Sequence, residues 1–115
     1  MESRTIHLPW PPSVNHYWLA HGKIRFIGKE GLAFRQCVKA LVNTTVPLDG
    51  ALTMVIEVTM PDNRRRDLDN LLKAPLDALQ HAGMYNDDCQ IEDLHIFKVG
   101  VAKPGGLKIT ITKRE

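Results

Sequence analysis

The chain has 115 residues, of which 43% are hydrophobic and 24% charged, and its formal net charge is +2. This length fits one domain, and the composition is that of a globular protein, which excludes a disordered chain. No apolar run approaches the roughly 20 residues of a membrane span, and the N-terminal segment MESRTIHLPW lacks the apolar core of a secretory signal. Two widely spaced cysteines indicate neither a zinc site nor a disulfide framework, so we expect a cytoplasmic protein with free thiols.

The first half of the chain predicts one strand and one helix. Thr5–Leu8 alternates between polar and apolar residues and ends at a proline, as a short strand does. Prolines then exclude a helix, and Pro12–Trp18 is expected to be an ordered loop. His21–Phe26 is expected to be a short irregular strand or a hairpin arm. Apolar residues at helical spacing predict a helix from about Lys29 to Val42.

The second half predicts a strand, a helix and two more strands. Ala51–Met60 alternates and is rich in β-branched residues, which favours a strand. Leucines at three- and four-residue steps from Leu68 predict a helix that ends near Gly83, with a kink at Pro75. The last two predicted strands are Ile91–Val99 and Leu107–Thr112. The order strand, helix, strand, helix, strand, strand indicates a single α+β domain over residues 1–115, with the helices packed on one mixed sheet.

The charges are unevenly distributed along the chain. Residues 1–39 and residues 94–115 each carry a balance of +4, whereas residues 61–93 carry −4. A plain nucleic-acid binder gains affinity from cations that meet phosphates, so an acidic middle would repel DNA. A divalent metal ion would neutralise these acids, and metal binding would explain why they are clustered.

The strongest chemical signal is the segment from Arg64 to Lys73. Asp67 and Asp69 fall where extended chain passes into the predicted helix, and Asp69 is one helical turn from Lys73. A second acidic pair, Asp87–Asp88, follows the helix. Magnesium prefers oxygen ligands and keeps several waters, so two or three carboxylates suffice to bind it. The fold must bring the second pair back to the first for all of them to meet.

Structural explanations for these residues remain open. Aspartate is a common N-cap and suits the start of a helix, and paired acids are ordinary in turns. The run Arg64–Arg66 either binds phosphates through paired hydrogen bonds or forms an ordinary charged surface that faces solvent. Lys73 either stabilises charge on a phosphate or pairs with Asp69 or Asp77 on its own helix.

Other kinds of active site are less well supported. The five histidines are scattered, neither serine lies in a nucleophile-elbow context, and there is no glycine-rich nucleotide-binding loop, so no nucleotide cofactor is expected. Cys89 is expected to be a poor nucleophile, because the neighbouring Asp88 would raise the pKa of its thiol.

An ordered set of motifs resembles the RusA family of Holliday junction resolvases. The run from Leu8 to Tyr17, LPWPPSVNHY, is similar to the opening of that family. The segment from Met60 to Lys73 resembles its central motif, and Asp77–Gly83 followed by Asp87–Ile91 completes the pattern. The resemblance covers nearly the whole chain, although residues 18–28 match poorly.

The resemblance implies a homodimer that binds four-way DNA junctions and makes paired symmetric nicks with Mg²⁺ or Mn²⁺, in DNA recombination and repair. The family's essential carboxylates fall on Asp67, Asp69 and Asp88, as metal ligands, and its essential lysine falls on Lys73. Asp87 matches the first of the paired acids and receives no role. Members of the family are frequent in prophages, which implies a bacterial or phage source.

Candidate DNA contacts are Arg64, Arg65, Arg66, Asn15 and Lys98. Trp10, Tyr17 and Trp18 would either stack on unpaired bases at the crossover or pack in the core or the dimer interface. Two other functions remain possible on this reading: a non-catalytic module that binds DNA junctions, and a metal-dependent phosphohydrolase that acts on small nucleotides.

Overall fold

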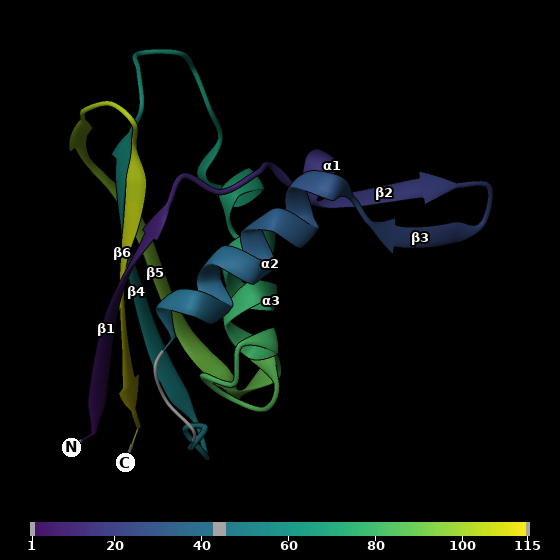
Figure 1. Ribbon diagram of the computed structural model, residues 1–115. Coiled ribbons are helices and arrows are strands. Elements are labelled where there is room, and N and C mark those ends of the chain that lie inside the picture. Colours follow the sequence, from purple (N-terminus) through teal and green to yellow (C-terminus); the bar gives the residue numbers. More distant parts are fainter. Residues whose placement is uncertain (1, 43–45, 115) are drawn as a thin grey trace.

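A computed structural model describes residues 2–42 and 46–114, and a four-stranded mixed sheet forms its centre (Figure 1). The strands are β1 (Ser3–Pro9), β4 (Leu52–Met60), β5 (Ile91–Val101) and β6 (Gly106–Lys113), in the spatial order β1-β6-β4-β5. β6 runs antiparallel to both β1 and β4, whereas β5 is parallel to β4. The order of helices and strands and the α+β class agree with the expectation from the sequence.

Alternation along the strands gives the sheet one apolar face. In β4 every second side chain, from Leu52 to Met60, is buried, while those between them are half-buried on the other face. β6 alternates in the same way, with Leu107, Ile109 and Ile111 buried. Successive side chains of a strand point to opposite faces, so this pattern leaves one face of the sheet to be covered.

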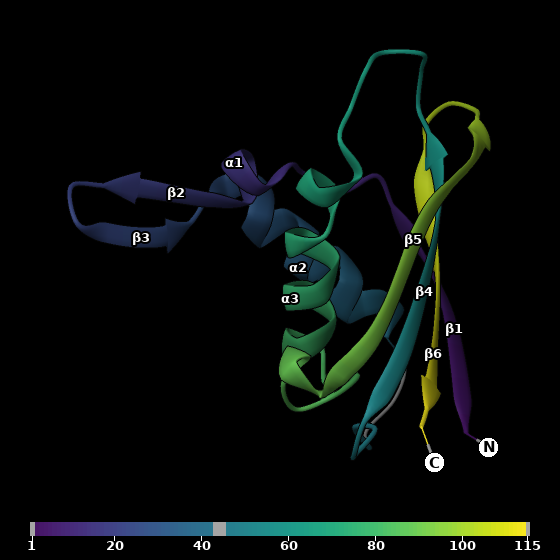
Figure 2. The ribbon, with the colours of Figure 1, turned by 180° about the vertical axis from the view of Figure 1, so that it is seen from behind.

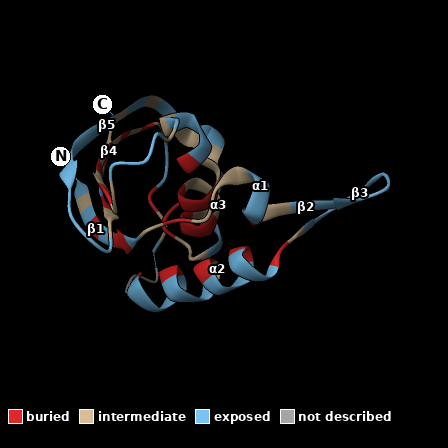
Figure 3. Cartoon of the chain, turned by 90° about the horizontal axis from the view of Figure 1, so that it is seen from above, coloured by how far each residue is buried: buried red, intermediate tan, exposed pale blue. Residues whose placement is uncertain are grey.

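Two helices cover that face. α2 (Lys29–Leu41) buries Phe34 and Val38 against the sheet, and α3 (Lys73–His81) buries Ala74, Ala78 and Leu79. Figure 2 shows both helices on the same side of the sheet, and Figure 3 shows the buried residues between the two layers. No helix in residues 2–42 and 46–114 is long and apolar enough to cross a bilayer.

The region expected to be a loop before Trp18 is more regular than predicted. A single helical turn, α1 (Val14–Tyr17), follows the prolines, and the amides of His16 and Tyr17 both donate to the Ser13 carbonyl. The loop prediction for Pro12–Trp18 was therefore wrong, because a proline restricts only itself and the residue before it.

The hairpin alternative for the next segment is confirmed. β2 (Trp18–His21) pairs with β3 (Ile24–Ile27) as a separate two-stranded sheet that projects from the body (Figure 1). Gly22, at φ +63°, adopts the left-handed conformation in the turn between the two strands.

The helix predicted from Leu68 is divided into two parts. A 3₁₀ helix, η1 (Leu68–Leu71), comes first, and the α-helix α3 begins only at Lys73. Pro75 therefore lies in the first turn of α3, where a backbone N–H has no partner within the helix. Instead of kinking a long helix, the proline accompanies its start. The predicted end near Gly83 is confirmed, with φ +88° at this residue.

Candidate active site

Asp67 and Asp69 lie where the chain enters η1. Asp67 is extended and holds the N-cap position, but its side chain makes no capping hydrogen bond. Asp69 follows in the first turn of η1, and both residues are exposed. Neither carboxylate has a hydrogen bond or ion pair with any residue in 2–42 or 46–114. The capping explanation for Asp67 is therefore not realised, and both carboxylates are available to a ligand.

Lys73 is the first residue of α3, and its side chain packs on an aromatic ring. Its Nζ lies 5.8 Å from the centre of the Trp18 ring. Within the described residues Lys73 forms no ion pair with either Asp69 or Asp77, so the salt-bridge explanation is not realised. The contact with Trp18 directs the ammonium group, whose N–H donors have no acceptor among the residues of the described chain.

Three cationic side chains from three different elements lie over the ring of Trp18. Arg25 of the hairpin lies 5.5 Å and Arg35 of α2 lies 5.8 Å from the ring centre, in addition to Lys73. Cations are attracted to the face of an indole ring, typically by about 0.5–2 kcal/mol each. The indole Nε1 is buried and has no hydrogen-bond partner among the residues described. Trp18 thus connects the base of the hairpin with the lysine at the start of α3.

A cluster of Tyr17, Arg35 and Asp77 ties three helices together below this site. The Tyr17 hydroxyl donates to Asp77, and Arg35 Nε donates to both the hydroxyl (3.0 Å) and Asp77 (2.9 Å). Arg35 Nη2 lies 2.8 Å from the Asp77 carboxylate, and the two side chains are only 19% and 18% exposed. Burial, reinforced by the Asp77 carboxylate, raises the pKa of Tyr17 above its usual range. The cluster could not be predicted from the sequence, because its three residues lie on three different helices and far apart along the chain.

The three arginines before Asp67 have different surroundings. Arg66 pairs with both oxygens of Asp62, at 2.5 Å and 3.2 Å, and lies 5.4 Å from the centre of the Trp10 ring. Its guanidinium lowers the pKa of Asp62 to about 2. The Arg64 amide donates to Asp62 Oδ1 at 2.9 Å, but its side chain is 81% exposed and brings Nε only to 3.9 Å from the Asp62 carboxylate. Arg65 is exposed and has no ion pair in the part of the chain that the structure describes.

A cavity of about 460 Å³ opens directly beside Asp67. Its lining combines apolar rings with polar and charged groups: Trp10, Pro11, Ser13, Arg65, Arg66, Asp67, Asn70 and Leu71. A second cavity, of about 680 Å³, shares Trp10, Pro11, Ser13 and Arg66 with the first. The two hollows therefore adjoin along the Trp10–Arg66 contact.

Asp88 lies beside the other end of α3. Its amide donates to Gln80 Oε1 (2.8 Å), near the C-terminus of that helix. Asp88 begins a short 3₁₀ helix, η2 (Asp88–Gln90), which Asp87 caps by accepting from the Cys89 amide at 2.9 Å. This hydrogen bond lowers the pKa of Asp87.

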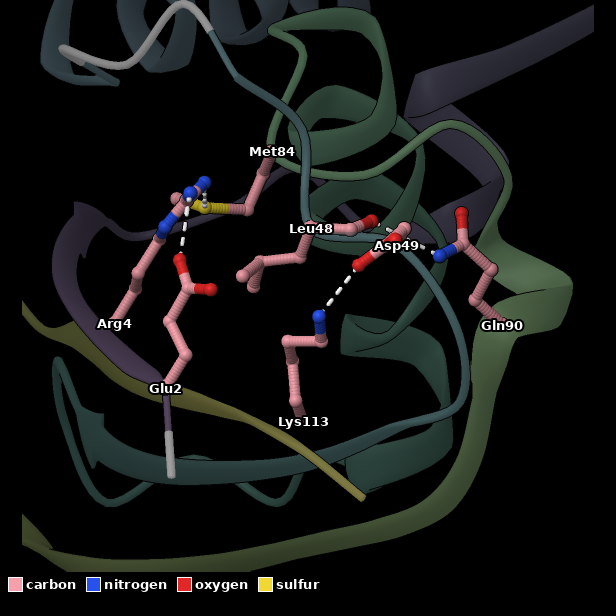
Figure 4. A network of polar contacts seen from close by, with 7 residues as sticks. All are labelled: Glu2, Arg4, Leu48, Asp49, Met84, Gln90 and Lys113. Atoms are coloured by element: carbon pink, nitrogen blue, oxygen red, sulfur yellow. Dashed lines mark hydrogen bonds and ion pairs between the residues drawn. The ribbon is translucent and has the colours of Figure 1, made fainter. Parts of the chain in front are cut away.

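Gln90 fixes the turn that carries Asp88. Its Oε1 accepts from the amides of Asn86 and Asp87, and its Nε2 donates to the carbonyls of Leu48 (3.0 Å) and Gly50 (2.9 Å). Figure 4 shows the hydrogen bond between Gln90 and Leu48 next to the ion pair between Lys113 and Asp49, which lies at the same end of the sheet. The backbone at Asp88 is therefore held firmly in place.

The predicted metal ligands lie in two separate places in the fold: Asp67 and Asp69 come before α3, and Asp88 comes after it. α3 has nine residues and so extends about 14 Å between Asp69 and the Asp88 turn, whereas two oxygens on one magnesium ion lie within about 4 Å of each other. Among the described residues, no group of three or more His, Cys, Asp or Glu could hold a metal ion. The three-carboxylate ligand set therefore stays a prediction.

The remaining candidate residues are dispersed. Asn15 is exposed on α1, and Lys98 is exposed on β5, where it pairs in register with Val58 of β4. The pKa of the Cys89 thiol is raised, as expected for a poor nucleophile. The largest cause is the hydrogen bond with Asp87, whereas the charge of Asp88 contributes less.

Comparison with known proteins identifies the family. The profile of endodeoxyribonuclease RusA matches residues 9–112. Crossover junction endodeoxyribonuclease RusA of Shigella sonnei is 43% identical over 117 residues, covering 98% of this chain and 97% of the relative. The proteins of the same name from Escherichia coli K12 (42%) and Enterobacteria phage 82 (43%) show the same coverage. The chain therefore belongs to the RusA family of endodeoxyribonucleases.

Proposed function

We propose that this protein is a metal-dependent endonuclease of the cytoplasm that resolves four-way DNA junctions by paired symmetric nicks. The names of its relatives support action on crossover junctions. The observation that carries the proposal is the pair of exposed carboxylates, Asp67 and Asp69, which have no partner among the described residues although Arg65 and Lys73 lie close by in the chain. Such unpaired groups of both signs suit a cation and the phosphates that it contacts.

The donor set fits magnesium or manganese. Magnesium is usually held by one or two carboxylates together with phosphate oxygens, and Asp67 and Asp69 offer hard oxygen donors of this kind. When bound, such an ion polarises a phosphoryl oxygen and lowers the pKa of a bound water. Lys73, directed by Trp18, would stabilise negative charge that develops on the phosphate. Arg65 would hold a neighbouring phosphate through paired hydrogen bonds.

A homodimer formed through the edge of β5 belongs to the proposal. β5 is an edge strand of eleven residues, so one side of its backbone lacks a neighbouring strand in the described sheet. Long edges of this kind favour pairing with another chain. Four large hydrophobic residues are exposed along this strand: Leu94, Phe97, Val99 and Val101. A two-fold axis would pair β5 with its copy in antiparallel orientation.

This dimer would bring the third carboxylate to the site. β5 begins just after Asp88 and ends at Val101, which pairs in register with Met60 at the end of β4. The segment that follows Met60 leads to Asp67 and Asp69 (Figure 2). An antiparallel copy would therefore present its own Asp88 at the end of the sheet where Asp67 and Asp69 lie. Two such composite sites, related by a two-fold axis, match the symmetry of a junction that is nicked twice.

The test compares three substrates: a labelled four-way junction, a linear duplex of equal length and a nucleotide, each with and without magnesium. We expect cleavage of the junction only, and only with magnesium. Asp69→Asn should abolish cleavage while salt-sensitive junction binding persists. Junction binding without cleavage by the wild type would favour a non-catalytic module, and preferential hydrolysis of the nucleotide would favour a phosphohydrolase; either result contradicts the proposal.

A further inference from the structure

Asp62 and Trp10 both contact the guanidinium of Arg66, and we call the guanidinium and the indole ring together the Trp10–Arg66 platform. Asp62 holds two nitrogens of the guanidinium and thereby fixes its plane, and the guanidinium carbon lies 5.4 Å from the centre of the indole ring. The charge of Arg66 is already balanced by Asp62, so Arg66 is a weaker phosphate ligand than Arg65, which has no ion pair with any residue that the structure describes. Each of the two groups is planar, and guanidinium and aromatic planes are the groups on which proteins stack unpaired bases.

The cavity against this platform has the composition of a base-binding slot. Its volume of about 460 Å³ lies within the range of roughly 300–1,000 Å³ that is typical of small-molecule sites. Trp10, Pro11 and Leu71 supply apolar walls. Asn70 lies on the same lining, and its side-chain amide has no hydrogen-bond partner in residues 2–42 and 46–114. An amide both donates and accepts, as the edge of a base requires.

The position of the cavity connects it with the cleavage site. Asp67 and Arg65 both form part of the lining. A nucleotide with its base in the cavity would place its phosphate next to Asp67. Bases at the crossing point of a junction lack a continuous stack, so the free energy needed to move one of them outwards is lower than in a duplex.

We infer that the cavity between the Trp10–Arg66 platform and Asp67 binds one unstacked nucleobase of the DNA next to the phosphate that is cut. The inference rests on the proposed function and deepens it, because it assigns the part of the junction that enters the site. Base recognition in this cavity would also make the cleavage rate depend on the base that occupies it, with Asn70 in contact with the edge of that base.

The experiment combines changes in the protein with changes in the DNA. A junction is prepared with an abasic residue at each position on either side of the cut, and single-turnover cleavage is measured with the wild type and with Trp10→Ala. At one position the missing base should slow the wild type about 5- to 150-fold, which corresponds to the roughly 1–3 kcal/mol of one base stacked on an aromatic ring. In Trp10→Ala, the same abasic residue should have no further effect.

Three further variants complete the design. Trp10→Phe keeps a stacking ring and should retain most of the abasic effect, so it serves where Trp10→Ala fails to fold. Arg66→Gln removes the guanidinium plane and should weaken the abasic effect. Were Arg66 a phosphate ligand instead, cleavage of intact and abasic junctions would fall equally, and this result would contradict the inference. Phe26→Ala changes an aromatic residue of the hairpin, 43% exposed and outside the cavity lining, and should leave the abasic effect intact.

The outcomes separate this inference from the proposed function. Two results would refute the base-binding cavity while leaving the nuclease in place. In the first, the wild type cuts the intact junction and no abasic position slows cleavage. In the second, the abasic residue slows Trp10→Ala by the same factor as it slows the wild type. If the wild type cuts no junction, the proposed function fails. The cavity is then tested by binding alone, with 2-aminopurine placed at positions around the crossover. The inference requires its emission to change with wild type and not with Trp10→Ala.

Discussion

Two substitutions of the same kind should affect different properties. Asp77→Asn should destabilise the fold, whereas Asp69→Asn should abolish cleavage and leave the stability almost unchanged. The Asp77 carboxylate accepts hydrogen bonds from Tyr17 and Arg35 and is 18% exposed. The Asp69 carboxylate is exposed and unpaired within the described chain. Each change replaces one oxygen by an NH₂ group and removes one charge, so the pair isolates the role of the surroundings.

The magnitude follows from the contacts of Asp77. Hydrogen bonds to charged groups are worth about 1.5–3 kcal/mol, and removing one partner of a buried ion pair costs about 3–5 kcal/mol. The remaining exposure of Asp77 and Arg35, and the one oxygen that asparagine retains, reduce this cost. We therefore expect Asp77→Asn to lower the free energy of unfolding by about 2–4 kcal/mol. Asp69→Asn should change it by no more than about 0.5 kcal/mol, as is usual for exposed, unpaired sites.

Urea unfolding measures both variants under the same conditions. The midpoint for Asp77→Asn should fall with little change in the slope, and that for Asp69→Asn should stay close to the wild type. Junction cleavage, measured where both variants are folded, should be lost in Asp69→Asn. The reasoning is refuted if the two substitutions lower the stability equally, or if Asp69→Asn is the less stable of the two.

Three further results are expected. Burial raises the pKa of Tyr17 and Tyr85 above the usual value of about 10, so their neutral phenols stabilise the fold below that pH, and this contribution is lost as the pH rises through the raised values. Phenolate absorbance should therefore stay low at about pH 11 until urea unfolds the chain, and titration of the folded protein near pH 10 would contradict this. The pKa of Asp62, about 2, should return towards the usual value of about 3.9 in Arg66→Gln when carboxyl signals are followed by NMR, and an unchanged midpoint would show that Arg66 is not the cause. Gly105→Ala should lower the free energy of unfolding by about 1–3 kcal/mol in urea melts, because Gly105 has φ +78° and a Cβ would lie 2.9 Å from a backbone nitrogen of the neighbouring loop; a stability equal to the wild type would contradict this.

Local patterns predicted most of the fold. The alternation in β4 and the helical spacing of α2 each arise from burial on one face, which leaves a period in the sequence. Pro75 was misread because a proline in the first turn and a proline at a kink look alike until the start of the helix is known. The extent of the hairpin from Trp18 to Ile27 was missed because most of its side chains are exposed, so burial leaves no clear period there.

The site was predictable only where its residues are close in sequence. Asp67, Asp69 and Lys73 lie within seven positions of one another and form a recognisable motif. The contacts of Lys73 with Trp18, and of Arg66 with Trp10, join segments that are far apart along the chain. Such contacts depend on how α1, the hairpin and α3 pack, and no local pattern of residues encodes that packing.

Mixed dimers test most directly whether Asp67 and Asp69 of one subunit act with Asp88 of the other. Asp69→Asn and Asp88→Asn are prepared separately, then combined by co-refolding and assayed on a labelled junction in magnesium. Each variant alone should be inactive. A mixed dimer retains one intact composite site, so the mixture should nick the junction once without resolving it into two duplexes. Activity in either variant alone, or an inactive mixture in which mixed dimers are present, would contradict the account.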